Sequence, residues 1–123
     1  MPNNQTHNMN IMFQALQLAD IPKLIAECPH TWYSQTLCKV NDSIVRLGVF
    51  KEGEFHWHKH DHEDEFFFVI QGALHIEFES ETVVLELHQG LTVPKGVMHR
   101  PFVTQPTAVM MVEPGTVRPT GDF

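Results

Sequence analysis

Residues 56–72 read HWHKHDHEDEFFFVIQG, and this stretch contains four of the nine histidines of the chain. The four stand at every second position from His56 to His62. Successive side chains of an extended strand point to opposite faces, so this spacing places all four on one face. Imidazole is a common ligand for first-row transition metals, and a metal site would explain such a cluster. The alternative is a solvated, histidine-rich edge strand without ligands.

The residues that follow select two of the four histidines. The pattern His-x-His-x4-Glu-x6-Gly is met by His58, His60, Glu65 and Gly72. Shifting the pattern back by two residues loses the glycine, and shifting it forward loses the carboxylate. We therefore predict a hairpin in which the two histidines end one strand and the glutamate begins the next, facing the same interior. The glycine then allows a tight turn.

A fourth ligand is predicted from residues 94–99, which read PKGVMH. Proline and glycine favour a turn here, and His99 follows it directly. Three imidazoles and one carboxylate suit one divalent transition metal, with one or two positions left for water or substrate. The ligands do not choose among Mn, Fe, Co, Ni, Cu and Zn. We predict that this metal is bound by His58, His60, Glu65 and His99.

The pattern of the whole chain predicts an all-β fold. From residue 32 onward, short runs rich in Val, Ile, Phe and Thr alternate with turn residues, as in a sandwich or barrel. Residues 55–60 are expected to form one of these strands. The plausible helical stretch is residues 11–27, which Pro22 limits to short pieces. The chain thus divides into residues 1–31, a leader and short helical segment, residues 32–114, the barrel, and residues 115–123, a tail.

Two segments carry further expectations. Residues 1–10 are polar and are interpreted as a short flexible leader. Residues 66–70, FFFVI, are apolar on both faces, so neither side of that strand is expected to meet water. One face would line the barrel interior. The other would be covered by a second layer of the same chain or by another subunit.

Composition excludes several classes of protein. The chain has 123 residues and a net charge of −7, and its eight Lys and Arg residues are scattered. We therefore expect a small-molecule partner and neither nucleic acid nor a membrane surface. No apolar run approaches the roughly 20 residues of a membrane span. Cys28 and Cys38 could pair, but two free thiols in a reducing cytoplasm is the preferred interpretation.

The two histidine motifs resemble those of the cupin superfamily. Gly53 with the pattern from His58 to Gly72 resembles the first cupin motif, and the segment from Gly90 to His99 resembles the second. The resemblance covers residues 43–114. Within the superfamily, the sequence is similar to small stand-alone bacterial cupins of the mannose-6-phosphate-isomerase-like type. Three residues separate Gly90 from Pro94, where the family usually has five. The resemblance implies a double-stranded β-helix (jelly-roll) barrel, a metal in the barrel mouth and a homodimer.

Four further residues are candidates for orienting the ligands or meeting a substrate: His56, Phe67, Met98 and Arg100. Each also has an ordinary structural explanation, because aromatic and methionine side chains are core residues by default and arginines usually form surface salt bridges. Arg46 could likewise hold an anionic substrate, but a surface salt bridge is expected for it as well. His62 and Glu63 lie in the predicted turn, where solvation is expected.

Three classes of function fit these features. The first is a metalloenzyme acting on a small, sugar-like or otherwise oxygenated metabolite, with isomerase, epimerase or dioxygenase chemistry. The second is a module that binds such a ligand without converting it. The third is a structural protein with a vestigial site, against which four intact ligands argue. No catalytic triad, phosphate-binding loop or dinucleotide motif appears in the sequence.

Overall fold

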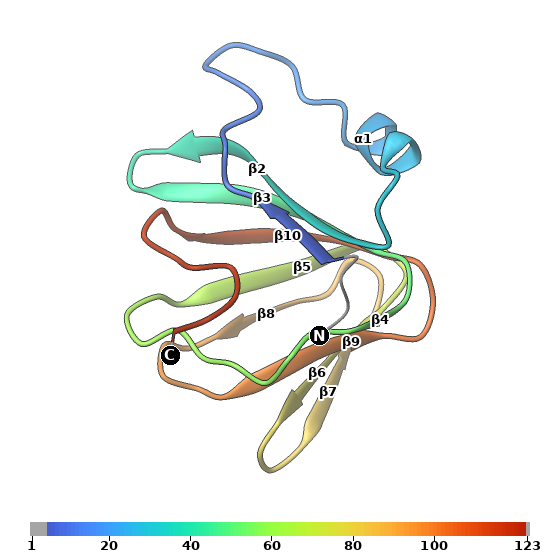
Figure 1. The fold of residues 1–123 in the computed structure, drawn as a ribbon, viewed down its shortest axis with the longest axis vertical. Coiled ribbons are helices and arrows are strands. Elements are labelled where there is room, and N and C mark those ends of the chain that lie inside the picture. The colour runs from blue at the N-terminus through green and yellow to red at the C-terminus, as the bar shows by residue number, and fades with distance from the viewer. Residues whose placement is uncertain (1–4, 123) are drawn as a thin grey trace.

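The computed structural model describes residues 5–122, which fold into ten strands and one short helix (Figure 1). In chain order the elements are β1 (Gln5–Asn8), α1 (Ile21–Glu27), β2 (Trp32–Val40), β3 (Ser43–Phe50), β4 (Gly53–Glu54), β5 (Glu65–Gln71), β6 (Leu74–Phe78), β7 (Thr82–Leu85), β8 (Gly90–Val93), β9 (His99–Val103) and β10 (Thr107–Pro114).

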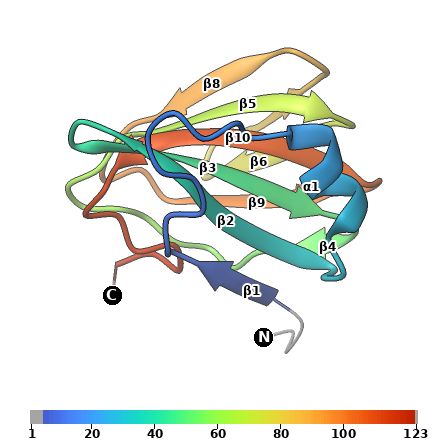
Figure 2. The same ribbon diagram turned by 90° about the horizontal axis from the view of Figure 1, so that it is seen from above.

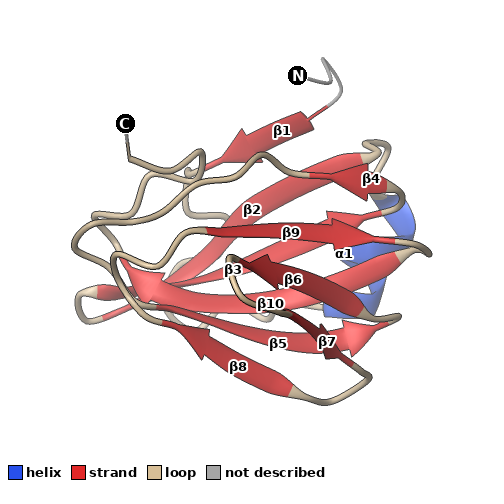
Figure 3. Ribbon diagram, turned by 90° about the horizontal axis from the view of Figure 1, so that it is seen from below, coloured by secondary structure: helices blue, strands red, loops and turns tan. Residues whose placement is uncertain are grey.

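The strands form two sheets that enclose the core. One sheet has the order β1-β2-β3-β10-β5-β8 and the other the order β4-β9-β6-β7. Figure 3 shows the smaller sheet lying across the larger one. Inward-facing side chains from both sheets meet between them, and Val69, Leu74, Ile76 and Val109 are fully buried there. The prediction of an all-β jelly-roll barrel with a short helical segment is confirmed.

The helix covers part of the outer face of the larger sheet. Asp20 caps its first turn by accepting a hydrogen bond from the Lys23 backbone N–H at 3.2 Å, and Pro22 occupies the first turn, where no N–H is needed. Figures 1 and 2 show α1 outside the barrel. Its Leu24 and Ile25 pack against a cluster around Leu47 on the sheet. The predicted helical stretch therefore begins at residue 21, and residues 11–20 are not helical.

The N-terminal segment is more ordered than the sequence suggested. Residues 5–8 form β1, which pairs in parallel with β2, whereas residues 1–4 lie outside the described part. His7 anchors this strand, with its Nδ1 2.8 Å from the Ser34 hydroxyl and its ring edge-on to Phe55. The expectation of a flexible leader is thus wrong for residues 5–8.

One other expectation is corrected. Residues 55–60 form no strand ladder and join the sheet through a single bridge between His58 and His99. On the outer face of β5, Phe66 is 37% exposed and stacks on Phe68, so a second layer of the same chain does not cover this residue, and cover by another subunit stays a prediction. None of the helical structure in residues 5–122 has the length and apolar character of a membrane span.

Candidate metal centre

The four predicted ligands come together from three separate segments. His58 and His60 lie in the loop between β4 and β5, Glu65 begins β5 and His99 begins β9. The backbones of His58 and His99 exchange two hydrogen bonds, at 3.0 and 2.9 Å, and this bridge ties the loop to β9. All four residues are buried, with exposed fractions of 6% or less.

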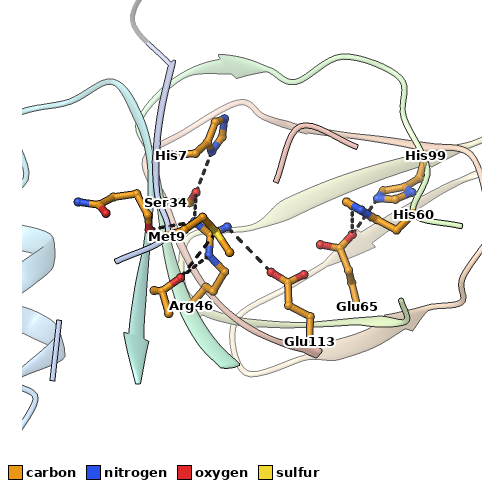
Figure 4. Close-up of polar contacts among 10 residues, drawn as sticks. His7, Met9, Ser34, Arg46, His60, Glu65, His99 and Glu113 are labelled. Carbon is orange, nitrogen blue, oxygen red and sulfur yellow. Dashed lines mark hydrogen bonds and ion pairs between the residues drawn. The ribbon is translucent and has the colours of Figure 1, made fainter. Parts of the chain in front are cut away.

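Their side chains converge on one point. One potential ligand atom from each lies within 4.8 Å of the others. The Glu65 Oε1 atom is 3.0 Å from His60 Nε2 and 3.4 Å from His99 Nε2 (Figure 4). The rings of His58 and His99 stand beside each other, with centroids 4.3 Å apart. This arrangement matches a ligand cluster for a single metal ion.

The converging atoms have close neighbours but no hydrogen bonds. Among residues 5–122, His60 Nε2, His99 Nε2 and Glu65 Oε1 are buried without a partner in hydrogen-bonding geometry. Leaving a buried polar group unsatisfied costs about 1–3 kcal/mol. A divalent cation would satisfy all three atoms together, because two imidazole nitrogens and a carboxylate oxygen form a favourable donor set for it. The residues present therefore fit a transition metal.

Backbone carbonyls orient two of the three imidazoles. His58 Nδ1 donates to the His56 carbonyl oxygen and His99 Nδ1 donates to the Val97 carbonyl oxygen, each at 2.9 Å. A proton held on Nδ1 leaves Nε2 with a free lone pair, the form in which a neutral imidazole binds metal. The loop geometry thus selects the ligand tautomer at both positions.

Comparison with known proteins identifies the family of the chain. Residues 47–116 match the cupin domain family. The chain is a cupin. It is 47% identical over 66 residues to YdbB of Bacillus subtilis and 34% identical over 58 residues to the polyketide synthase CurC of Streptomyces cyaneus. These matches cover 53% and 46% of this chain but only 58% and 38% of the two relatives.

A solved structure extends the likeness over most of the barrel. The crystal structure of a cupin-2 domain protein from Shewanella frigidimarina superposes with a TM-score of 0.74 at 29% identity. The superposition covers 79% of this cupin and 94% of the other chain.

Charges around the cluster keep Glu65 ionised. Burial alone would raise the pKa of Glu65, but its contacts with Glu113, His60 and His99 outweigh burial and hold the pKa well below its usual range. Burial, reinforced by Glu65, raises the pKa of Glu113 well above its usual range. Burial and repulsion by His99 lower the pKa of His58 to about 4. Near neutral pH the site therefore presents an ionised Glu65 and a neutral His58, as metal binding requires.

A small cavity of about 40 Å³ opens beside the cluster. Two ligands, His58 and Glu65, line it together with Arg46 and Ser34. Figure 4 shows Glu113 between Arg46 and Glu65. The remaining wall is mostly apolar, formed by His7, Trp32, Phe50, Phe55, Phe67, Pro101, Met111 and Pro119. The cavity thus combines the candidate metal ligands with one buried cation and a largely water-excluding surface.

The structure places the other sequence candidates in different environments. Phe67 lines the cavity and is 4% exposed. His56 is half-buried, and its Nε2 lies 2.6 Å from the Thr120 carbonyl oxygen of the C-terminal segment. Met98 lines a separate surface pocket with Trp57. Arg100 lies outside the cavity, where it pairs with Glu54 and Glu77.

Sequence reasoning misplaced two charged residues. Arg46 is not in a surface salt bridge: it is 2% exposed, and its guanidinium donates to the Thr36 and Ser34 hydroxyls at 3.1 and 2.8 Å. Glu63 is not solvated: it is 6% exposed and accepts a hydrogen bond from Thr116 at 2.7 Å. The C-terminal segment covers the turn that contains Glu63, and only long-range packing could show this.

Glu113 was missed altogether, although a signal was available. It is 3% exposed in β10 and has the same parity as Val109 and Met111, which face the core. Strict alternation along a strand predicts that such a residue points inward. The same reasoning applies to Arg46, which has the parity of the core residue Phe50 in β3.

Proposed function

We propose that this cupin binds one divalent transition metal through His58, His60, Glu65 and His99 and acts on a small oxygenated metabolite. The observation that carries the proposal is the convergence of buried, unsatisfied ligand atoms beside a cavity that also contains Arg46. The chemistry would be isomerase-like, epimerase-like or dioxygenase-like. A bound metal would supply Lewis acidity to a carbonyl or enediolate oxygen, or a site for dioxygen chemistry.

The residues of the cavity have separable roles in this proposal. Arg46 is held rigidly, because its Nε and Nη2 atoms donate to Thr36 and Ser34, while Nη1 is 3.9 Å from Glu113. Its charge favours a substrate with an anionic or strongly polar oxygen. Phe67 and the other apolar side chains exclude water, which strengthens electrostatic interactions in the cavity.

The size of the cavity restricts what fits without a conformational change. A volume of about 40 Å³ holds roughly three water molecules at ~10–15 Å³ each. A sugar-sized substrate therefore requires movement of a segment at the wall, and Pro119 of the C-terminal segment is one candidate. We also propose a cytoplasmic location, supported by Cys28 and Cys38, which are free thiols in the structure.

Metal content is the first test. Untagged protein analysed by inductively coupled plasma mass spectrometry is expected to contain about one equivalent of a single metal, and the double variant His58→Ala/His60→Ala is expected to lose it. His62→Ala is the matched control, because His62 belongs to the same histidine run but is exposed. Absence of metal from wild-type protein, even after reloading, would contradict the proposal.

The identity of the metal then selects the activity assay. Iron or copper leads to oxygen-consumption measurements, and zinc, manganese, nickel or cobalt leads to a panel of sugar and hydroxy-acid isomerisations. Turnover that is lost when a chelator removes the metal supports an enzymatic function. Tight binding of a small molecule with no product for any metal would instead favour the non-catalytic binding module.

A further inference from the structure

The third imidazole of the metal centre is held differently from the other two. His58 and His99 each have Nδ1 bonded to a backbone carbonyl, whereas His60 Nδ1 is buried and has no hydrogen-bond partner among residues 5–122. His60 is 2% exposed, so bulk water does not satisfy this atom. A metal-binding histidine normally donates its second ring N–H to a carbonyl or a carboxylate.

Two carboxylates lie beside this ring, on residues outside the predicted ligand set. A ring nitrogen of His60 and one carboxylate oxygen each of Glu63 and Asp122 lie within 4.8 Å of one another. Since His60 Nε2 faces Glu65 at 3.0 Å, Nδ1 is the nitrogen available to this second group. The unsatisfied nitrogen and the nearby carboxylates are therefore complementary.

Asp122 is fixed to both chain neighbours of His60. Its carboxylate Oδ2 accepts a hydrogen bond from the Asp61 backbone N–H at 2.7 Å, and its own N–H donates to the Lys59 carbonyl oxygen at 2.9 Å. Glu63 is instead engaged through Oε2 by the Thr116 hydroxyl at 2.7 Å. These two hydrogen bonds, to Lys59 and to Asp61, hold the Asp122 side chain beside the His60 ring.

The two residues before Asp122 also pack against the loop that contains His58 and His60. Gly121 has no room for a side chain, because a Cβ there would lie 2.6 Å from the His58 Cβ atom. The Thr120 carbonyl oxygen lies 2.6 Å from His56 Nε2. Figure 1 shows this segment, in red, beside the loop that precedes β5. Residues 120–122 thus contact the ligand loop at several successive positions.

We propose that Asp122 is a positioning residue of the metal centre, which accepts the Nδ1 proton of His60 and so presents Nε2 of that ring to the metal. This inference rests on the proposed metal site. A carboxylate acceptor makes the imidazole a more basic ligand than a carbonyl does, and loss of such an acceptor typically weakens metal binding about 10–100-fold. The C-terminal segment is then part of the metal centre.

A second cation between His60, Glu63 and Asp122 is the competing interpretation. Glu63 and Asp122, but not His60, line a polar pocket of about 310 Å³ together with Asp61, His62, Thr116 and Arg118. His60 is not part of this lining, so a cation held by the carboxylates of the pocket would leave His60 Nδ1 without a partner. Metal stoichiometry separates the two interpretations.

The test measures zinc affinity by competition with a chromogenic chelator. Asp122→Ala is expected to weaken binding about 10–100-fold at an unchanged stoichiometry of one, and Asp122→Glu to recover part of the loss. Asp42→Asn is the matched control for a lost carboxylate, because Asp42 is exposed, and it should bind zinc like wild type. A second zinc equivalent in wild type that disappears in Asp122→Ala would overturn the positioning role, as would an unchanged affinity.

Histidine nitrogen NMR of the zinc-loaded protein provides a readout that loss of packing alone does not reproduce. We expect a downfield Nδ1–H resonance for His60 that shifts in Asp122→Ala but not in Glu63→Gln. The opposite pattern would assign the role to Glu63 and refute the proposal. If wild type binds no metal, the proposed function fails. The His60 Nδ1–H resonance is then compared between metal-free wild type and metal-free Asp122→Ala, and an unchanged resonance would show that Asp122 does not accept this proton.

Discussion

Replacing Gly72 by alanine tests why the first histidine motif ends in glycine. Gly72 lies in the turn between β5 and β6 with a φ of +73°, and a Cβ there would lie 2.4 Å from the Pro106 carbonyl oxygen and 2.7 Å from Thr107 Oγ1. Neither neighbour yields easily. The first is backbone, and Thr107 is 2% exposed and donates to the Ala73 carbonyl oxygen at 3.0 Å.

The expected loss of stability combines three contributions. A left-handed conformation costs a non-glycine residue about 1–2 kcal/mol. Overpacking against fixed atoms adds about 1–3 kcal/mol. Restricting the unfolded chain returns about 0.4–1 kcal/mol. Gly72→Ala should therefore lower the free energy of unfolding by roughly 2–4 kcal/mol, a large part of the ~5–15 kcal/mol of an ordinary domain.

Gly96→Ala is the matched control for this variant. Gly96 has a similar φ of +80°, but a Cβ there would meet nothing within 4 Å. Its substitution should cost only the conformational strain, about 1 kcal/mol after the unfolded-state gain. Urea unfolding of both variants with a chelator present measures the difference without any contribution from metal. Equal losses in the two variants would refute the role of the close approach to Pro106 and Thr107.

Three further predictions concern pH, a surface arginine and assembly. The pKa of His58 is lowered from 6.5 to about 4. Between these values the unfolded state binds one more proton at this residue, so His58 adds up to about 1.4 kcal/mol of stability per pH unit to metal-free protein as pH rises, and urea unfolding of His58→Gln should show a slope reduced by that amount, with the contribution of His7, whose pKa is also lowered to about 4, unchanged. Arg100→Ala should change stability by less than about 1 kcal/mol and leave metal content unchanged, because Arg100 lies at the surface, where it pairs with Glu54 and Glu77 and contacts the exposed ring of Trp57. The homodimer stays a prediction, supported by the exposed Leu16 and Leu18, and light scattering should show that Leu16→Glu/Leu18→Glu weakens it.

The features that depend on local spacing could be predicted from the sequence. The two-residue period of His58 and His60, the following Glu65 and the turn before His99 led to the four residues that the structure brings together. Alternating apolar runs between turn residues led to the all-β fold. Both arguments work because strand geometry and turn chemistry act within a few residues.

The features that depend on distant contacts could not be predicted in this way. Glu63 is buried only because the C-terminal segment packs on its turn, and its partner Thr116 is 53 residues away. β1 forms because residues 5–8 pair with the free edge of β2, and local patterning does not specify this pairing. The loop at residues 55–60 has strand-like composition but lacks a ladder, since it meets β9 only through the isolated bridge of His58 and a single hydrogen bond from the Phe55 N–H to the Pro101 carbonyl oxygen.

The energetic cost of burying Arg46 indicates that this residue has a functional role. Burying a guanidinium carries a desolvation penalty of several kcal/mol, and apolar residues of similar volume often stabilise a core better than a buried ion pair does. Here the interior around Arg46 is lined by Trp32, Phe50 and Met111, which would accommodate such a replacement. Local rules for a stable core are usually broken at functional sites. The position of Arg46, in the lining of the same cavity as His58 and Glu65, therefore favours a ligand-binding role over a purely structural one.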